Sequence, residues 1–101
     1  MRVIEEKMLR AIKNKRDWQE RNTRVRVYDN GYVVWLYSTP IFAQIDGAEF
    51  VCDGGWRTRT TQSRLNALGV PYSTNARLNE RRNVDVIPYN RMKGVMWHLT
   101  R

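Results

Sequence analysis

The first twenty residues place apolar side chains at the spacing of one helix face. The residues that share this face are Ile4, Met8, Ala11 and Ile12. Their interval of three or four positions predicts an amphipathic α-helix. Acidic residues come early in the segment and basic residues come late, which is the order that the helix dipole favours. We expect the apolar side of this helix to pack on the core and the charged side to face solvent.

The next segment alternates apolar and polar residues, which is the period of a β-strand. Residues 24–28 and 32–37 read as two strands, and the dipeptide Asn30-Gly31 between them is typical of a tight hairpin turn. The cross-strand pairs that a turn centred there predicts are Val27–Val34, Val25–Leu36, Tyr28–Val33, Arg26–Trp35 and Arg24–Tyr37. This pairing separates an aliphatic face from a face on which arginines alternate with aromatic rings.

The arginine-aromatic face has more than one interpretation. Its members include Arg24, Arg26, Trp35 and Tyr37. Guanidinium groups beside aromatic rings form either an internal cation-π ladder or an exposed platform on which nucleic-acid bases stack. The same residue types are enriched at the hot spots of protein interfaces, so the face also suits a protein partner. The sequence leaves these interpretations open.

Later segments continue the sheet and add a second helix. Residues 41–45 and 49–52 are short apolar runs between turn sequences, so the middle of the chain predicts an antiparallel meander. Residues 61–68 predict a short helix that opens on a threonine cap and ends at a glycine. Residues 84–87 and 95–99 read as a final hairpin.

These elements predict a single small α+β domain over residues 1–101. The expected fold is an antiparallel β-meander of four to six strands with an N-terminal amphipathic helix and a short central helix, both packed on the aliphatic face. The length of 101 residues fits one domain. The longest apolar run, Tyr32–Tyr37, is far shorter than the roughly 20 residues of a membrane span. We expect a cytoplasmic protein without membrane contact, whose oligomeric state stays open, with a homodimer through an edge strand possible.

Positive charge is concentrated in the second half of the chain. The sequence has 18 Lys and Arg residues against 10 Asp and Glu residues, a formal net charge of +8. Residues 1–53 are nearly neutral, whereas residues 54–101 contain nine basic and two acidic residues. Excess charge also keeps small proteins soluble. Its concentration in one half nevertheless favours an anionic partner, and nucleic acid is the leading class.

The sequence carries no convincing catalytic or metal-binding set. Cys52 is the only cysteine and His98 the only histidine, which excludes an intramolecular disulfide and a zinc site built from several Cys and His ligands. A cysteine that ends a strand is typically a core residue. Asp46 and Asp53 occupy turn sequences, where aspartate forms local hydrogen bonds. We therefore predict no enzyme activity, no metal and no cofactor.

Residues 54–66 form the candidate functional segment. They combine two glycines, four hydroxyl residues, three arginines and the predicted start of a helix, and together these groups suit a phosphate. The tryptophan adds a flat ring for a base. The predicted nucleic-acid or phosphate contacts are Trp56, Arg57, Thr58, Arg59, Thr60, Thr61 and Arg64, joined by Arg77, Arg81 and Arg82 from the basic stretch that follows. A structural alternative makes Trp56 and Leu65 core anchors, Thr60 or Thr61 the helix cap and the arginines solvated side chains.

The same segment carries a recurring pattern, Gly-Trp-x-Thr-x-Thr-Thr-x-x-Arg-Leu-Asn. The positions that match are Gly55, Trp56, Thr58, Thr60, Thr61, Arg64, Leu65 and Asn66. With the meander before it, the segment resembles a family of small tailed-bacteriophage and prophage proteins described as a domain of unknown function. The resemblance covers residues 24–70. It implies a phage protein that acts inside a bacterial cell, during host takeover or counter-defence, and it implies no reaction.

Three functions therefore stay open. The leading hypothesis is a nucleic-acid-binding accessory protein that contacts phosphates through its arginines. The second is an inhibitor that binds and blocks a host protein, such as a defence nuclease or a polymerase. The third is a protein that sequesters a nucleotide signal in the glycine- and threonine-rich segment.

Overall fold

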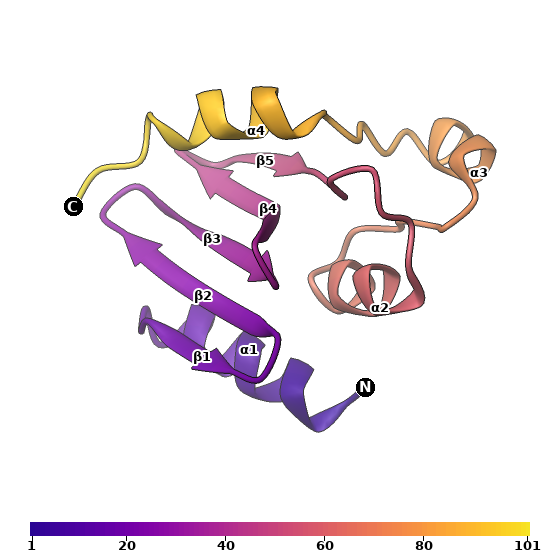
Figure 1. Ribbon diagram of the computed structural model, residues 1–101. Coiled ribbons are helices and arrows are strands. Elements are labelled where there is room, and N and C mark those ends of the chain that lie inside the picture. Colours follow the sequence, from indigo (N-terminus) through magenta and orange to yellow (C-terminus); the bar gives the residue numbers. More distant parts are fainter.

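A five-stranded antiparallel sheet forms the centre of the computed structural model, which describes residues 1–101. Each strand pairs with the next one along the chain, in the order β1-β2-β3-β4-β5 (Figure 1). The strands are β1 (Trp18–Glu20), β2 (Thr23–Tyr28), β3 (Gly31–Leu36), β4 (Thr39–Ile45) and β5 (Ala48–Val51). The predicted α+β fold with an antiparallel meander is confirmed.

Helices cover both faces of this sheet. They are α1 (Val3–Lys13), α2 (Arg59–Ala67), α3 (Ala76–Arg81) and α4 (Tyr89–Met96). In Figure 1, α1 lies against the β1–β2 side of the sheet and α4 runs along β4 and β5, while α2 and α3 stand together at one end of the molecule. None of the four helices is long and apolar enough to cross a membrane.

The aliphatic face of the hairpin packs against α1 and α2, as predicted. Val25 and Val34 of the sheet lie in one buried cluster with Met8 of α1 and Leu65 of α2. All four side chains are at most 1 % exposed. Because burying such a side chain stabilises the fold by about 1.5–3 kcal/mol, this cluster fixes where α2, and the loop before it, sit on the sheet.

The opposite face is also covered. Val33 and Ala43 of the sheet pack with Ile87 and with Met92 of α4 in a second buried cluster. Trp35 lies at the edge of the same cluster. Trp35 of the arginine-aromatic face is therefore packed beside the cluster that α4 covers, and is not part of an open platform.

The β2–β3 hairpin has a different register from the predicted one. Tyr28 pairs with Gly31, so the turn is Asp29-Asn30, and every predicted partner is displaced by two residues. The faces are unchanged because a shift of two positions preserves the alternation of side chains. Gly31 is required by packing and not by the turn, since a Cβ there would lie 1.7 Å from the backbone oxygen of Gln44 in β4.

The side chain of Asn30 explains the rest of this turn sequence. Its Nδ2 donates to the carbonyl oxygen of His98 at 2.8 Å, and its Oδ1 accepts from the amide of Thr100 at 2.9 Å. The hairpin turn therefore holds the C-terminal segment across the molecule.

The predicted C-terminal hairpin is wrong. Val86 makes only an isolated parallel bridge with Val51 of β5, and Tyr89–Met96 is a helix that starts after Pro88. Met92, Val95, Met96 and Leu99 pack on the second cluster, at intervals of three and four residues that fit a helix face. The apolar residues near the end of the chain follow the period of a helix and not the period of two that a strand requires.

Three further elements depart from the prediction. The strand β1 was missed because three residues are too few to show alternation. Helix α1 ends at Lys13, and Lys15 adopts a left-handed conformation (φ 52°) in the turn before β1. Helix α2 begins at Arg59, with Thr58 as its N-cap, and so earlier than residue 61.

Candidate functional site

The loop between β5 and α2 is tied to the core by Asp53. Its Oδ1 accepts from the amide of Gly55 at 2.9 Å, and its Oδ2 accepts from the hydroxyl of Tyr72 at 2.8 Å. Tyr72 is fully buried. Burial, and then the hydrogen bond to the carboxylate, raise the pKa of Tyr72, so it remains a hydrogen-bond donor. This buried contact fixes the start of the loop.

Gly54 brings the loop close to the sheet. Its φ of +64° lies in the left-handed region, and a Cβ there would meet Cγ2 of Thr39 at 2.9 Å. Glycine is the residue that accepts both conditions without strain. The loop therefore crosses directly over the end of β4 nearest the β3–β4 turn.

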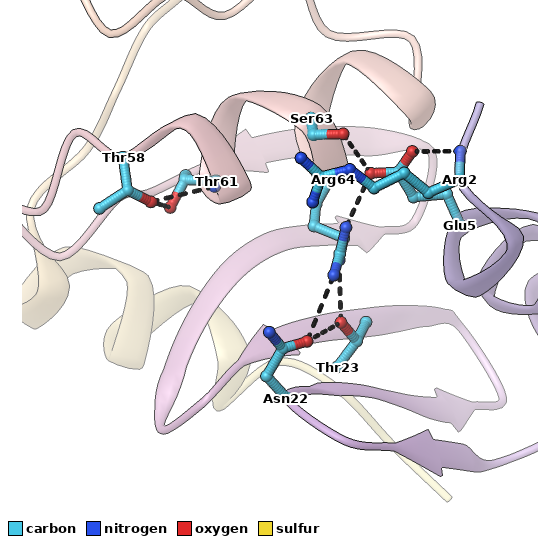
Figure 2. A network of polar contacts seen from close by, with 8 residues as sticks. All are labelled: Arg2, Glu5, Asn22, Thr23, Thr58, Thr61, Ser63 and Arg64. Atoms are coloured by element: carbon cyan, nitrogen blue, oxygen red, sulfur yellow. Dashed lines mark hydrogen bonds and ion pairs between the residues drawn. The ribbon is translucent and has the colours of Figure 1, made fainter.

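Thr58 and Thr61 are occupied by the start of α2. The Thr58 hydroxyl accepts from the amide of Thr61 at 3.2 Å, and the two hydroxyls are 3.0 Å apart (Figure 2). Thr61 is 3 % exposed. The helix cap is therefore Thr58 and not Thr60 or Thr61, which the structural alternative had predicted. The buried Thr61 is not placed for direct phosphate contact.

A pocket of about 440 Å³ lies between this loop and the β3–β4 turn. Tyr37, from the β3–β4 turn, and Trp56, from the loop, are 76 % and 71 % exposed and form its rim. The polar groups that line it are Ser38, Thr39, Asp53, Thr58, Thr60 and Thr61. We call this cavity the Tyr37–Trp56 pocket.

Arginines without ion pairs surround this end of the molecule. Arg57 and Arg59 follow Trp56 in the chain and are exposed, and Arg77, Arg81 and Arg82 are exposed on α3 and its C-cap. None of these five takes part in the protein's three ion pairs, which are Lys7–Glu20, Glu5–Arg64 and Asp17–Arg101. Figure 1 shows α2 and α3 together at this end, so the predicted basic residues of the two segments share one region, apart from Arg64.

Arg64, one of the predicted phosphate contacts, is buried in an ion pair within the fold. Its side chain is 3 % exposed, and its Nη1 is 2.8 Å from Oε2 of Glu5, itself buried on α1. Nε of Arg64 donates to Oγ1 of Thr23 at 2.9 Å, and Nη2 donates to Oδ1 of Asn22 at 3.3 Å. Ser63 also donates to Glu5. Figure 2 shows these contacts, which we call the Arg64 network.

The Arg64 network keeps Glu5 charged. Burial by itself would raise the pKa of this carboxyl, but the hydrogen bonds from Ser63 and Arg64 outweigh it and hold the pKa below its usual value. Arg64 therefore joins α1, α2 and β2 instead of facing a ligand.

The residues predicted on the arginine-aromatic face do not form one continuous binding surface. Arg24 pairs with Trp35 across the sheet, and both are half-buried. Nε1 of Trp35 is buried without a partner. Tyr37 lies beyond the end of β3, and neither Arg24 nor Arg26 takes part in the two cation-π contacts that form. Of this set, Tyr37 alone lines the candidate pocket.

The sequence reasoning missed two features of the surface. It did not bring Tyr37 next to Trp56, because the two residues lie on separate turns. It also missed an exposed strip on α4, where Tyr89 is 39 % and Trp97 is 85 % exposed, with Nζ of Lys93 5.5 Å from the centre of the Tyr89 ring. Their spacing of four residues was the available signal, and it was obscured by the strand prediction.

The remaining candidate chemistry is limited. No group of three or more His, Cys, Asp or Glu side chains gathers to hold a metal ion. Cys52 is fully buried, and burial is the main reason that the pKa of its thiol is raised. A thiol in that state is a poor nucleophile.

Comparison with known proteins gives one match. A family model described as Kyanoviridae Gp96 protein matches residues 1–94. The comparisons with curated proteins and with solved structures returned no significant match.

Proposed function

The chain belongs to the Kyanoviridae Gp96 family of phage proteins, and we propose that it binds nucleic acid through the end of the molecule formed by the β5–α2 loop, α2 and α3. The observation that carries this proposal is an exposed tryptophan ring, Trp56, followed in the chain by two exposed arginines that have no ion-pair partner, Arg57 and Arg59. Such a combination offers phosphate contacts and a surface for stacking in one place.

The charge of this end supports an anionic partner. Residues 54–83 contain six arginines and one acidic residue, Glu80. Arg64 is neutralised by Glu5, and the other five arginines face solvent without an ion pair. Guanidinium groups form bidentate hydrogen bonds with phosphate oxygens. The release of counterions from the nucleic acid drives binding at low salt. Arg77, Arg81 and Arg82 would extend the contact along the strand.

The test is a salt titration with matched variants. Fluorescence anisotropy of a labelled oligonucleotide measures Kd for the wild type, for Arg57→Ala/Arg59→Ala and for Arg10→Ala/Arg16→Ala. The second double variant removes the same charge from exposed positions at the end of α1 and the turn after it. We expect the first pair to weaken binding by about tenfold or more and to reduce the slope of log K against log salt by about 1.5, because two phosphate contacts are lost. Equal effects of the two pairs would reject the assignment of the site.

A second candidate function is binding of a host protein through α4. The strip formed by Tyr89, Lys93 and Trp97 is the observation that favours it, because an exposed tryptophan beside tyrosine and a cation is typical of interface hot spots. A nuclease-treated pull-down from host cells should then recover one partner with the wild type and with Arg57→Ala/Arg59→Ala. The same partner should be lost with Trp97→Ala. Retention by Trp97→Ala would exclude the α4 strip as the contact surface.

A further inference from the structure

We infer that the Tyr37–Trp56 pocket holds an unpaired nucleobase, so that the protein selects single-stranded over duplex nucleic acid. The inference rests on the proposed nucleic-acid function and adds the chemical class that the pocket recognises. It combines four observations: two exposed rings, their rigid support, the polar lining and the distribution of charge.

The two rings at the rim are available to a ligand. Tyr37 and Trp56 come from different turns, and each exposes more than two thirds of its surface. They do not pack on each other, since the aromatic pair that the protein forms is Tyr32 with Phe42, at 5.8 Å between ring centres. Aromatic surface left in water favours contact with a flat, apolar face, and every nucleobase has such a face.

Tyr37 is held in place by its backbone. It has a φ of 55°, a left-handed conformation that is rare for a bulky residue and persists only when surrounding contacts impose it. Here the amide of Tyr37 donates to the carbonyl oxygen of Asn22 at 2.7 Å. The side chain of Asn22 in turn accepts from Arg64 and from Thr23. Through Asn22, the Arg64 network therefore holds the backbone of Tyr37 in place at this side of the pocket.

Trp56 has its own support on the other side. Its amide donates to the carbonyl oxygen of Asp53 at 2.9 Å, and Asp53 is bound by the buried hydroxyl of Tyr72. Gly54 closes the loop against Thr39. A ring whose backbone is already fixed loses less conformational entropy on binding than a ring on a free loop.

The residues that line the pocket favour a neutral base over a phosphate. Asp53 is the one charged residue among those that line the pocket, and its carboxylate would repel a phosphate from the interior while accepting hydrogen bonds from a neutral base. Ser38, Thr39 and Thr60 add hydroxyl donors and acceptors. Arg57 and Arg59 lie outside the lining, next to Trp56, where a phosphate is favoured. The base therefore enters the pocket and its phosphate stays at the rim.

The size of the pocket agrees with this occupant. Its volume of about 440 Å³ lies within the roughly 300–1,000 Å³ of small-molecule sites. A base inside a duplex has its faces covered by its neighbours and its edge occupied by its partner, so it must leave the stack before it can enter. Single-stranded nucleic acid presents the base without that cost.

The test uses three labelled probes of equal length. They are a single-stranded 12-mer, its duplex and a 12-mer made of abasic sites, each prepared as DNA and the first two also as RNA. Anisotropy at low salt measures Kd for the wild type and for Tyr37→Ala, Trp56→Ala, Tyr37→Phe, Trp56→Phe and Trp97→Ala. Circular dichroism and thermal melting confirm that each variant is folded.

We expect the wild type to bind the single strand at least about tenfold more tightly than the duplex or the abasic probe. Each alanine variant at the pocket should weaken single-strand binding by roughly tenfold, because one stacking surface is removed. The phenylalanine variants should keep most of the affinity, since a ring remains, and Trp97→Ala should not differ from the wild type. Equal binding of single strand, duplex and abasic probe, or unchanged affinity of both alanine variants, would overturn the inference.

The experiment separates this inference from the proposed function. If all three probes bind with a steep salt dependence that needs Arg57 and Arg59, the protein binds nucleic acid but the pocket holds no base. If no probe binds at low salt, both the proposed function and the inference fail. A nucleoside monophosphate that quenches Trp56 and binds more tightly than the 12-mer would keep the base pocket but replace the strand by a free nucleotide, which overturns the selection of single strands.

Discussion

The underside of α2 and the loop in front of it contain the same residue types in opposite environments. Arg64 on the underside is buried and bound to Glu5, Thr23 and Asn22. Arg57 and Arg59 in and next to the loop are exposed and have no ion-pair partner. The composition of the segment does not distinguish these arginines. Their burial does: Arg64 stabilises the fold, whereas Arg57 and Arg59 are free to contact a ligand.

The largest expected effect is the loss of stability when Arg64 is removed. In Arg64→Ala, the carboxylate of Glu5 stays buried without its partner, and breaking a buried ion pair in this way costs about 3–5 kcal/mol. Urea denaturation measures the change, with Lys7→Ala as the control because the Lys7–Glu20 pair is exposed and is expected to contribute less than about 1 kcal/mol.

A double variant separates the ion pair from the general packing of α2. Glu5→Leu/Arg64→Met leaves no buried charge, so it should lose less stability than the sum of the two single changes. Additive losses would show that the Arg64 network contributes no coupling energy, and Arg64 would then differ from Arg57 and Arg59 in burial alone.

The division between the two regions was only partly predictable from sequence. The meander and the N-terminal helix followed from periodicity, because Met8, Val25 and Val34 each belong to an apolar pattern at helix or strand spacing. The second helix followed from the threonine and the glycine that bound it. The burial of Arg64 did not follow, since its partner Glu5 lies on another helix. From the sequence, Glu5 is one of two acidic residues in the first turn that the helix dipole favours, and nothing local distinguishes it from its neighbour Glu6.

The pocket depended on information that the sequence does not display. Tyr37 was assigned to the sheet because the predicted hairpin turn was placed at Asn30-Gly31. The structure explains Gly31 by its contact with β4 and ends the strand before Tyr37. The composition of its segment identifies Trp56, but the second ring of the pocket, Tyr37, lies in a turn whose geometry only the assembled sheet defines. α4 was misread because its apolar residues fit a strand about as well as a short helix.

Acidification is the next way to test the Arg64 network. Because the pKa of Glu5 is lower in the folded protein than in the unfolded chain, its charge stabilises the fold above the ordinary glutamate pKa of about 4.3. That contribution is lost as pH falls through the lower, folded value. The melting temperature should therefore drop more steeply below about pH 4.3 in the wild type than in Glu5→Gln. Parallel curves would remove Glu5 as a source of acid sensitivity.

A smaller effect is expected at the anchor of the loop. Tyr72→Phe removes the hydroxyl that donates to Asp53 but keeps the buried ring, so it should cost about 1.5–3 kcal/mol, as for a hydrogen bond to a charged group. Because this contact also positions the Trp56 loop, oligonucleotide binding should weaken moderately while the fold persists. Loss of stability with unchanged binding would show that the loop is positioned without Asp53.

The helix cap gives a still smaller and purely structural effect. Thr58→Ala removes the hydroxyl that accepts from the Thr61 amide, which should reduce the free energy of unfolding by about 1 kcal/mol. Thr58→Ser keeps the cap and should restore most of that loss in a urea titration. If serine fails to restore it, the methyl group of Thr58, and not its hydroxyl, supports the start of α2.

The smallest expected change in stability is the one that separates the two regions most sharply. Arg57→Ala/Arg59→Ala removes two exposed, unpaired side chains, so the free energy of unfolding should change by no more than about 0.5 kcal/mol for each. Urea denaturation of this variant, beside that of Arg64→Ala, compares arginines of one segment in the two environments. Removing two like charges from a strongly basic end also relieves repulsion, so we expect any change to be a slight gain in stability. A loss above about 1.5 kcal/mol would mean that these arginines hold the loop in place, and weakened oligonucleotide binding in the variant would then report a disturbed fold instead of missing phosphate contacts.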